Sequence, residues 1–178
     1  MPEVFELVRQ MVREPAFPNL HAVVVHFPVA LLVTATLLDL ACLAARRATW
    51  LDRAATTLYV LGTTAAGLAF LTGNAAAGDL WSVSAETQRV MADHRSMALL
   101  TLAAFAAIAV LRLAVSHLGR KDKRISFGFF RLLALGAALA AQLLLGATAH
   151  LGGSLVYRHG VAVGPLVSAA DPVDELEP

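Results

Sequence analysis

Four long apolar runs separated by short charged stretches make up most of this chain. The hydrocarbon core of a bilayer needs about 20 mostly apolar residues per helix, and each run reaches that length. The stretches between and beside these runs hold most of the charged side chains. The pattern therefore predicts four membrane-spanning helices, over residues 22–45, 54–78, 95–118 and 127–150.

Short loops between these spans predict an all-α fold, an integral membrane four-helix bundle with up-down-up-down topology, in a domain of residues 19–163. Ahead of it, residues 1–18 place apolar side chains on one helical face. This predicts an interfacial amphipathic helix, although a helix docked on a partner protein fits the same pattern. Residues 164–178 are acidic and predict a disordered tail.

Composition supports a membrane protein and excludes several other classes. Apolar residues make up 58% of the chain and charged residues 15%, where a soluble domain carries about 25% charged residues. A net charge of +1 provides no basic surface for nucleic acid. The single cysteine, Cys42, excludes an internal disulfide and a cysteine-ligated iron–sulfur cluster. No nucleophile–base pair, phosphate loop or paired carboxylates point to a hydrolytic enzyme.

The distribution of basic residues predicts the orientation. Lys and Arg accumulate on the cytoplasmic side of membrane proteins. Here they gather in the first and third loops, at Arg46, Arg47 and Arg53, and at Arg120, Lys121, Lys123 and Arg124. We therefore expect a multi-pass protein of the inner (cytoplasmic) membrane with both termini outside, in contact with the lipid bilayer.

Polar residues within or beside the spans carry further expectations. Asp39 and Gln142 lie inside spans and are expected to hold helices together, with a proton path as the alternative for Asp39. Arg112 lies near the end of its span, where its side chain is expected to snorkel to the interface. Ser84 can cap a helix that begins at Ala85.

Five of the six histidines fall at the outer end of this predicted bundle: His21, His26, His94, His150 and His159. His21 and His26 are five residues apart, roughly 140° around a helix, so only one of them can face the bundle. We expect that one to be His26, which lies deeper by roughly 7 Å.

His26, His94 and His150 lie at the outer ends of three different predicted helices, so the sequence predicts that they converge. An ionisable residue inside a span, such as His26, is usually functional. Gly152 and Gly153 are expected to let the chain turn, which brings His159 over the site as a lid or carries it into water.

Haem b is the first chemistry that these histidines suggest, because it needs two neutral imidazoles on opposite sides of a plane inside an apolar bundle. The candidate ligands are His26, His94 and His150, followed by His21 and His159. Such a protein would carry electrons between a quinol and an external periplasmic or membrane carrier.

Two alternatives remain open at this point. Zinc or copper could bind His26, His94 and His150, with His21 or His159 completing a tetrahedral set. Alternatively, the chain is a non-catalytic scaffold subunit of a larger membrane complex, and its histidines only form hydrogen bonds.

Four phrases carry a resemblance to a known family: LHAVVVHFPVALL (20–32), FLTGNAAAGDLW (70–81), DHRSMALLTL (93–102) and AHLGGSLVYRHGVAV (149–163). Together they resemble the bacterial four-helix membrane proteins of the domain-of-unknown-function family DUF2231, over about residues 19–163. Some members are joined to Rieske-type or cytochrome-like modules, which implies electron transfer around a quinone or haem. Relatives usually have proline where this chain has Ala22, a departure that favours His26 over His21.

Overall fold

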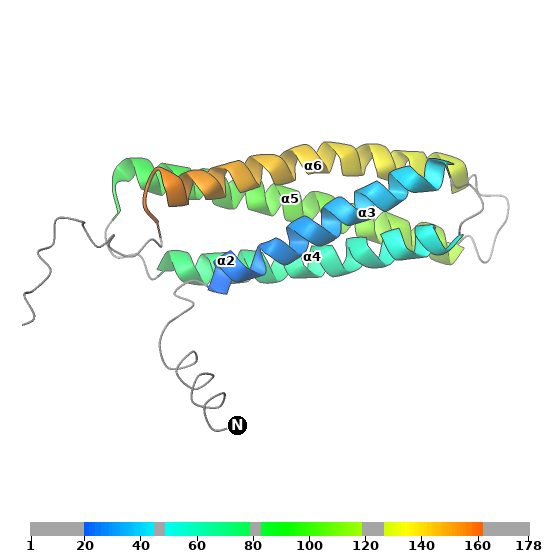
Figure 1. Cartoon of the computed structure of the whole chain (residues 1–178), viewed down its shortest axis with the longest axis horizontal. Helices are drawn as coiled ribbons and strands as arrows, with labels where there is room; N and C mark the ends of the chain where they lie inside the picture. The colour runs from blue at the N-terminus through cyan, green and yellow to red at the C-terminus, as the bar shows by residue number, and fades with distance from the viewer. Residues whose placement is uncertain (1–19, 45–48, 79–82, 119–126, 162–178) are drawn as a thin grey trace, which may run out of the picture.

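Four long helices run side by side in a computed structural model of the chain (Figure 1). The structure describes residues 20–44, 49–78, 83–118 and 127–161, and none of these residues forms a strand. The first long helix is in two pieces, so the elements are α2 (Leu20–Val24), α3 (His26–Ala44), α4 (Thr49–Gly78), α5 (Ala85–Leu118) and α6 (Phe127–Tyr157). The predicted all-α four-helix bundle is confirmed.

All four helices are long and apolar enough to cross a membrane. Each overlaps a predicted span, but α5 begins well before residue 95 and α6 continues past residue 150. Ser84 caps α5 as predicted, because its Oγ accepts a hydrogen bond from the Thr87 backbone N–H at 3.1 Å. The predicted amphipathic helix (1–18) and acidic tail (164–178) lie outside the described residues.

Proline explains the break between α2 and α3. Pro28 has no backbone N–H, and its ring crowds the carbonyl of Val24, four residues earlier. The helix is interrupted at Val25, between these two positions. As a result, α2 forms a separate short helical segment ahead of α3.

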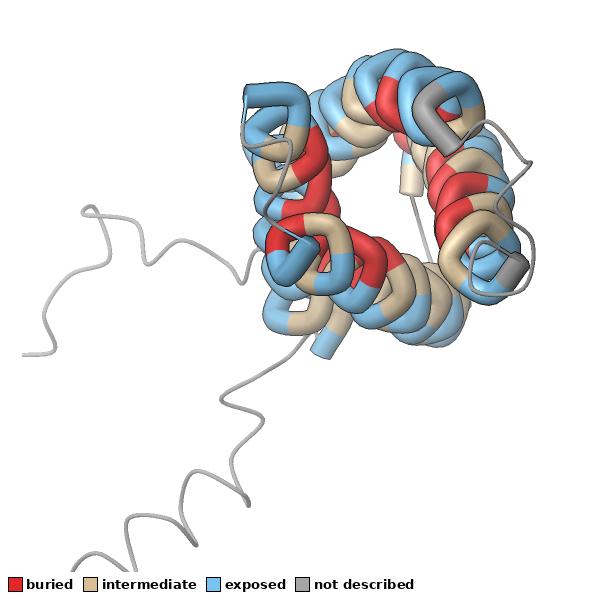
Figure 2. Tube along the Cα trace, turned by 90° about the vertical axis from the view of Figure 1, so that its right-hand side faces the viewer, coloured by how far each residue is buried: buried red, intermediate tan, exposed pale blue. Residues whose placement is uncertain are grey.

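The helices pack as two hairpins. α3 packs most extensively against α4, and α5 against α6, while the contacts α4–α5 and α3–α6 that join the hairpins are less extensive. Seen along the bundle, the helices surround a common axis and the buried residues line its inner side (Figure 2). The core is a cluster of eight buried residues: Leu32, Ala35, Tyr59, Phe105, Ile108, Ala109, Ala138 and Ala141.

The outer surface of the bundle is apolar. Large hydrophobic side chains point outward from every long helix, among them Leu37, Leu68, Val110 and Leu143, the last of which is 77% exposed. A continuous apolar surface of this extent would aggregate in water. It suits a bundle surrounded by lipid, where each helix satisfies its own backbone hydrogen bonds.

Candidate functional site

Two histidines from different hairpins face each other at one end of the bundle, which we call the histidine end. His21 lies on α2 and His94 on α5, and their ring centroids are 6.3 Å apart with an interplanar angle of 79°. Both side chains are partly buried. Both were among the predicted ligands. Because their rings lie close together, this pair is the centre of the candidate site.

The His21 ring is fixed by a backbone carbonyl of α4. Its Nδ1 lies 2.8 Å from Ala69 O and 3.4 Å from Thr72 Oγ1. A carbonyl oxygen can only accept, so Nδ1 carries the proton in the neutral ring and the lone pair is on Nε2. This is the tautomer in which a metal-binding imidazole is commonly held.

The His94 ring is held in the same way by α6. Its Nδ1 lies 3.0 Å from Thr148 O, so its lone pair is also on Nε2. The Thr148 hydroxyl in turn lies 2.9 Å from the hydroxyl of buried Thr101 on α5. Each histidine is therefore anchored to the partner helix of its own hairpin.

A glycine lies against each ring. A Cβ added at Gly73 would lie 2.9 Å from His21 Cε1, and one added at Gly152 would lie 3.1 Å from His94 Cε1. In both hairpins the glycine follows the carbonyl residue by one helical turn, since Gly73 follows Ala69 and Gly152 follows Thr148. The same histidine–carbonyl–glycine arrangement thus occurs twice, although no local sequence pattern predicts that either glycine lies against a histidine ring.

His26 and His150 do not join this pair, and the prediction that they face inward is wrong. Both residues are exposed. Their separation of roughly 140° around the helix does allow only one of His21 and His26 inside, as predicted. It is His21, held by the Ala69 carbonyl, whereas His26 lies on the outer surface.

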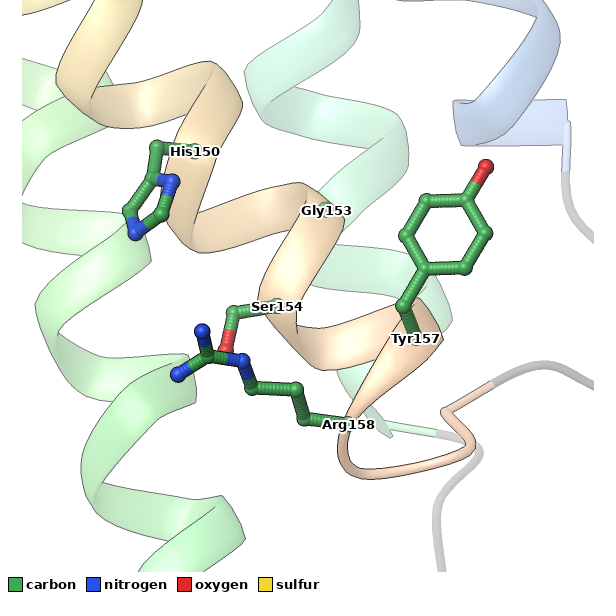
Figure 3. A pocket seen from close by; sticks show the side chains of 5 residues that line it. All are labelled: His150, Gly153, Ser154, Tyr157 and Arg158. Carbon is green, nitrogen blue, oxygen red and sulfur yellow. The ribbon is translucent and has the colours of Figure 1, made fainter.

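On the outside of α6, His150 lines a shallow cavity of about 240 Å³ with Gly153, Ser154, Tyr157 and Arg158. The Tyr157 and Arg158 side chains point to opposite sides of this helix face (Figure 3). The cavity is separate from the His21–His94 pair, because neither of those two histidines lines it.

The expected turn at Gly152 and Gly153 is also wrong. Both glycines are helical, and α6 continues to Tyr157 before the chain turns at Gly160, where φ is +63°. His159 lies in this turn, and its Nδ1 is 3.2 Å from the Thr87 hydroxyl at the start of α5. It joins the ends of the two helices rather than covering the histidine pair.

The predicted three-histidine metal set does not form among the residues that the structure describes. Nowhere in that part of the chain do three His, Cys, Asp or Glu side chains come close enough to hold a metal ion. The chain therefore presents a pair of opposed imidazoles.

Buried charges occupy the opposite end, which we call the arginine end. Arg112 donates to Asp39 Oδ1 at 2.6 Å and to Asp52 Oδ1 at 3.0 Å, and the Arg112 side chain is only 3% exposed. Arg131 donates to the other Asp52 oxygen at 2.5 Å. The expectation that Arg112 snorkels to the interface is wrong, because carboxylates of α3 and α4 hold it inside.

A short polar network joins the helices between the two ends. The Gln142 side-chain amide donates to Leu32 O at 3.0 Å and to Thr36 Oγ1 at 2.8 Å. The Tyr59 hydroxyl donates to the same Thr36 oxygen at 3.2 Å. Asp39 and Gln142 therefore hold helices together, as their place inside the spans predicted.

Comparison with known proteins places the whole membrane domain in one family. The family model described as "Predicted membrane protein (DUF2231)" matches residues 18–165. No curated protein and no solved structure matches the chain. Since the match covers most of the chain and all four membrane-length helices, the protein belongs to the DUF2231 family of predicted membrane proteins.

Proposed function

We propose that this protein is a membrane electron-transfer protein that holds haem b between His21 and His94. The observation that carries the proposal is the facing pair of imidazoles, 6.3 Å apart between ring centroids. With metal–nitrogen bonds of about 2 Å and about 1 Å more to each ring centre, two imidazoles that bind one iron would have their ring centres about 6 Å apart. The spacing of the His21 and His94 ring centres supports the proposal.

The surroundings of both rings support the same assignment. Carbonyl oxygens at Ala69 and Thr148 hold each Nδ1–H, which makes Nε2 the nitrogen that would ligate iron. Gly73 and Gly152 let each ring pack closely against the neighbouring helix, because a Cβ at either position would collide with the ring. The pair also lies between the two hairpins, which contact each other less extensively than the helices within each hairpin do.

Bound haem would supply a one-electron redox couple. His21 and His94 would hold the haem, carbonyl oxygens fix both imidazole tautomers, and apolar helices surround the pair. As part of the proposal, electrons pass between a quinol and an external carrier. The excess of Lys and Arg in the first and third loops supports an outward-facing histidine end in the inner membrane, where such a carrier could dock.

The test uses the full chain, produced in haem-replete cells and purified in mild detergent. We expect a Soret absorption band and about one haem per chain, by analogy with other proteins that ligate haem through two histidines. His21→Ala and His94→Ala should each abolish the band. His26→Ala and His150→Ala are matched controls that should retain it, because both side chains are exposed.

Other outcomes would contradict the proposal. A colourless wild-type protein with stoichiometric zinc or copper would favour a metal site, and one without any bound group would favour a scaffold subunit. If His26→Ala or His150→Ala removed the band while His21→Ala retained it, the ligand assignment would be wrong. Helix content from circular dichroism distinguishes loss of haem from loss of fold.

A further inference from the structure

A second cavity lies at the arginine end, between the first turns of α4, the last turns of α5 and the start of α6. Its volume is about 760 Å³, three times that of the cavity beside His150. The polar residues that line it are Thr49, Asp52, Arg53, Thr56, Thr57, Arg112, Ser116 and Arg131. The histidine pair lies at the opposite end of the bundle, so this cavity belongs to a different site.

The charges that line the cavity are mainly positive. Three guanidinium groups and one carboxylate face it, and Asp52 is shared between Arg112 and Arg131. Arg131 keeps 47% of its side chain exposed, and Arg53 is exposed too. Arg112 is occupied by Asp39 and Asp52, but each guanidinium has five N–H donors, so the exposed Arg53 and Arg131 retain donors able to bind an anion.

The remaining wall is apolar and extends toward the middle of the helices. It is formed by Val60 and Leu61 on α4, Leu113 and Val115 on α5, and Phe130 on α6. Leu61 lies about 12 Å along the helix from Arg53, at 1.5 Å per residue. The cavity thus offers positive charge at the helix ends and an apolar surface within the span, which fits a ligand that is itself anionic at one end and apolar at the other.

We propose that this cavity binds an anionic phospholipid, with its phosphate between Arg53 and Arg131 and an acyl chain along Leu61 and Leu113. Guanidinium groups pair well with phosphate oxygens, and basic pockets between membrane helices are suited to anionic lipid headgroups. Arg112, tied to Asp39 and Asp52, contributes a fixed charge behind the two exposed arginines. A free phosphate ion offers the same headgroup chemistry but leaves the apolar wall unused.

The experiment uses the full chain in a neutral detergent and measures ligand binding by native mass spectrometry. The probes are short-chain phosphatidylglycerol, phosphatidylcholine of the same chain length and inorganic phosphate. Phosphatidylglycerol should bind preferentially, and Arg53→Gln and Arg131→Gln should each weaken its binding about fivefold. Arg89→Gln and Arg158→Gln, exposed residues near the histidine end, should leave it unchanged.

Three results would overturn the proposal. The first is equal binding of phosphatidylglycerol and phosphatidylcholine, which would remove the role of charge. The second is binding of inorganic phosphate as tight as that of phosphatidylglycerol, which would assign the arginines to a free anion. The third is an equal loss of binding in the control variants, because the lipid would then respond to net charge and not to this cavity.

Discussion

Two arginines that share one carboxylate offer a direct measure of what burial does to an ion pair. Arg112 and Arg131 donate to Asp52 at 3.0 and 2.5 Å, but their side chains are 3% and 47% exposed. We expect Arg112→Gln to lower the free energy of unfolding by about 3–5 kcal/mol, because the buried Asp39 carboxylate loses its partner. Arg131→Gln should cost less than about 1 kcal/mol, because water screens an exposed pair.

The size of the Arg112 effect has an internal check. Asp39 Oδ2 lacks a hydrogen-bond partner among the described residues, so the loss of Arg112, which donates to Oδ1, leaves a buried carboxylate without its cation. Adding Asp39→Asn to Arg112→Gln removes the orphaned charge and should restore at least about 1 kcal/mol.

Reversible unfolding in mixed micelles, with increasing SDS and helix content as the readout, measures these differences. A difference of less than about 0.5 kcal/mol between Arg112→Gln and Arg131→Gln, the usual range for surface substitutions, would contradict the effect of burial. A double variant less stable than Arg112→Gln alone would contradict the role of the unpaired Asp39 carboxylate.

Four further substitutions test other contacts. Gly73→Ala should cost about 1–3 kcal/mol and shift the NMR signals of His21, because its Cβ would lie 2.9 Å from that ring. Gly67→Ala, with nothing within 4 Å, should instead gain up to about 1 kcal/mol from helix propensity, and equal losses in both variants would contradict this. Gln142→Leu removes two hydrogen bonds to α3 and should cost about 0.6–1.7 kcal/mol in the same unfolding assay, whereas a gain in stability would show that the bonds are dispensable. Ser84→Ala should cost about 0.5–2 kcal/mol and speed amide exchange in the first turn of α5 alone, so unchanged exchange there would refute the cap.

Features set by neighbouring residues could be predicted from the sequence. The length and apolarity of each run predicted the four helices, and Ser84 predicted the start of α5. The helical wheel also showed that His21 and His26 cannot both face the interior. Which of the two faces the interior depends on the Ala69 carbonyl and on Gly73, which lie on α4. No local sequence pattern gives the position of α4 relative to α2.

The buried ion pair escaped prediction for a related reason. Arg112 was considered within its own helix, where proximity to the helix end favours snorkelling. Its partner Asp39 lies on another helix, near the same end of the bundle. The sequence did contain a sign of this pair: an acidic and a basic residue lie at similar depth in two different spans. Up-down topology brings those two positions to the same end of the bundle.

The order of Asp39, Asp52 and Arg112 along the chain has a consequence for how the protein enters the membrane. A carboxyl group can enter the bilayer as the neutral acid, whereas a guanidinium cannot shed its proton. An unpaired arginine at a helix centre costs about 2.5–3.5 kcal/mol during insertion. Since synthesis proceeds from the N-terminus, both acidic partners are delivered before the third span emerges from the ribosome. Arg112 can therefore pair with Asp39 and Asp52 as soon as the third span inserts into the membrane.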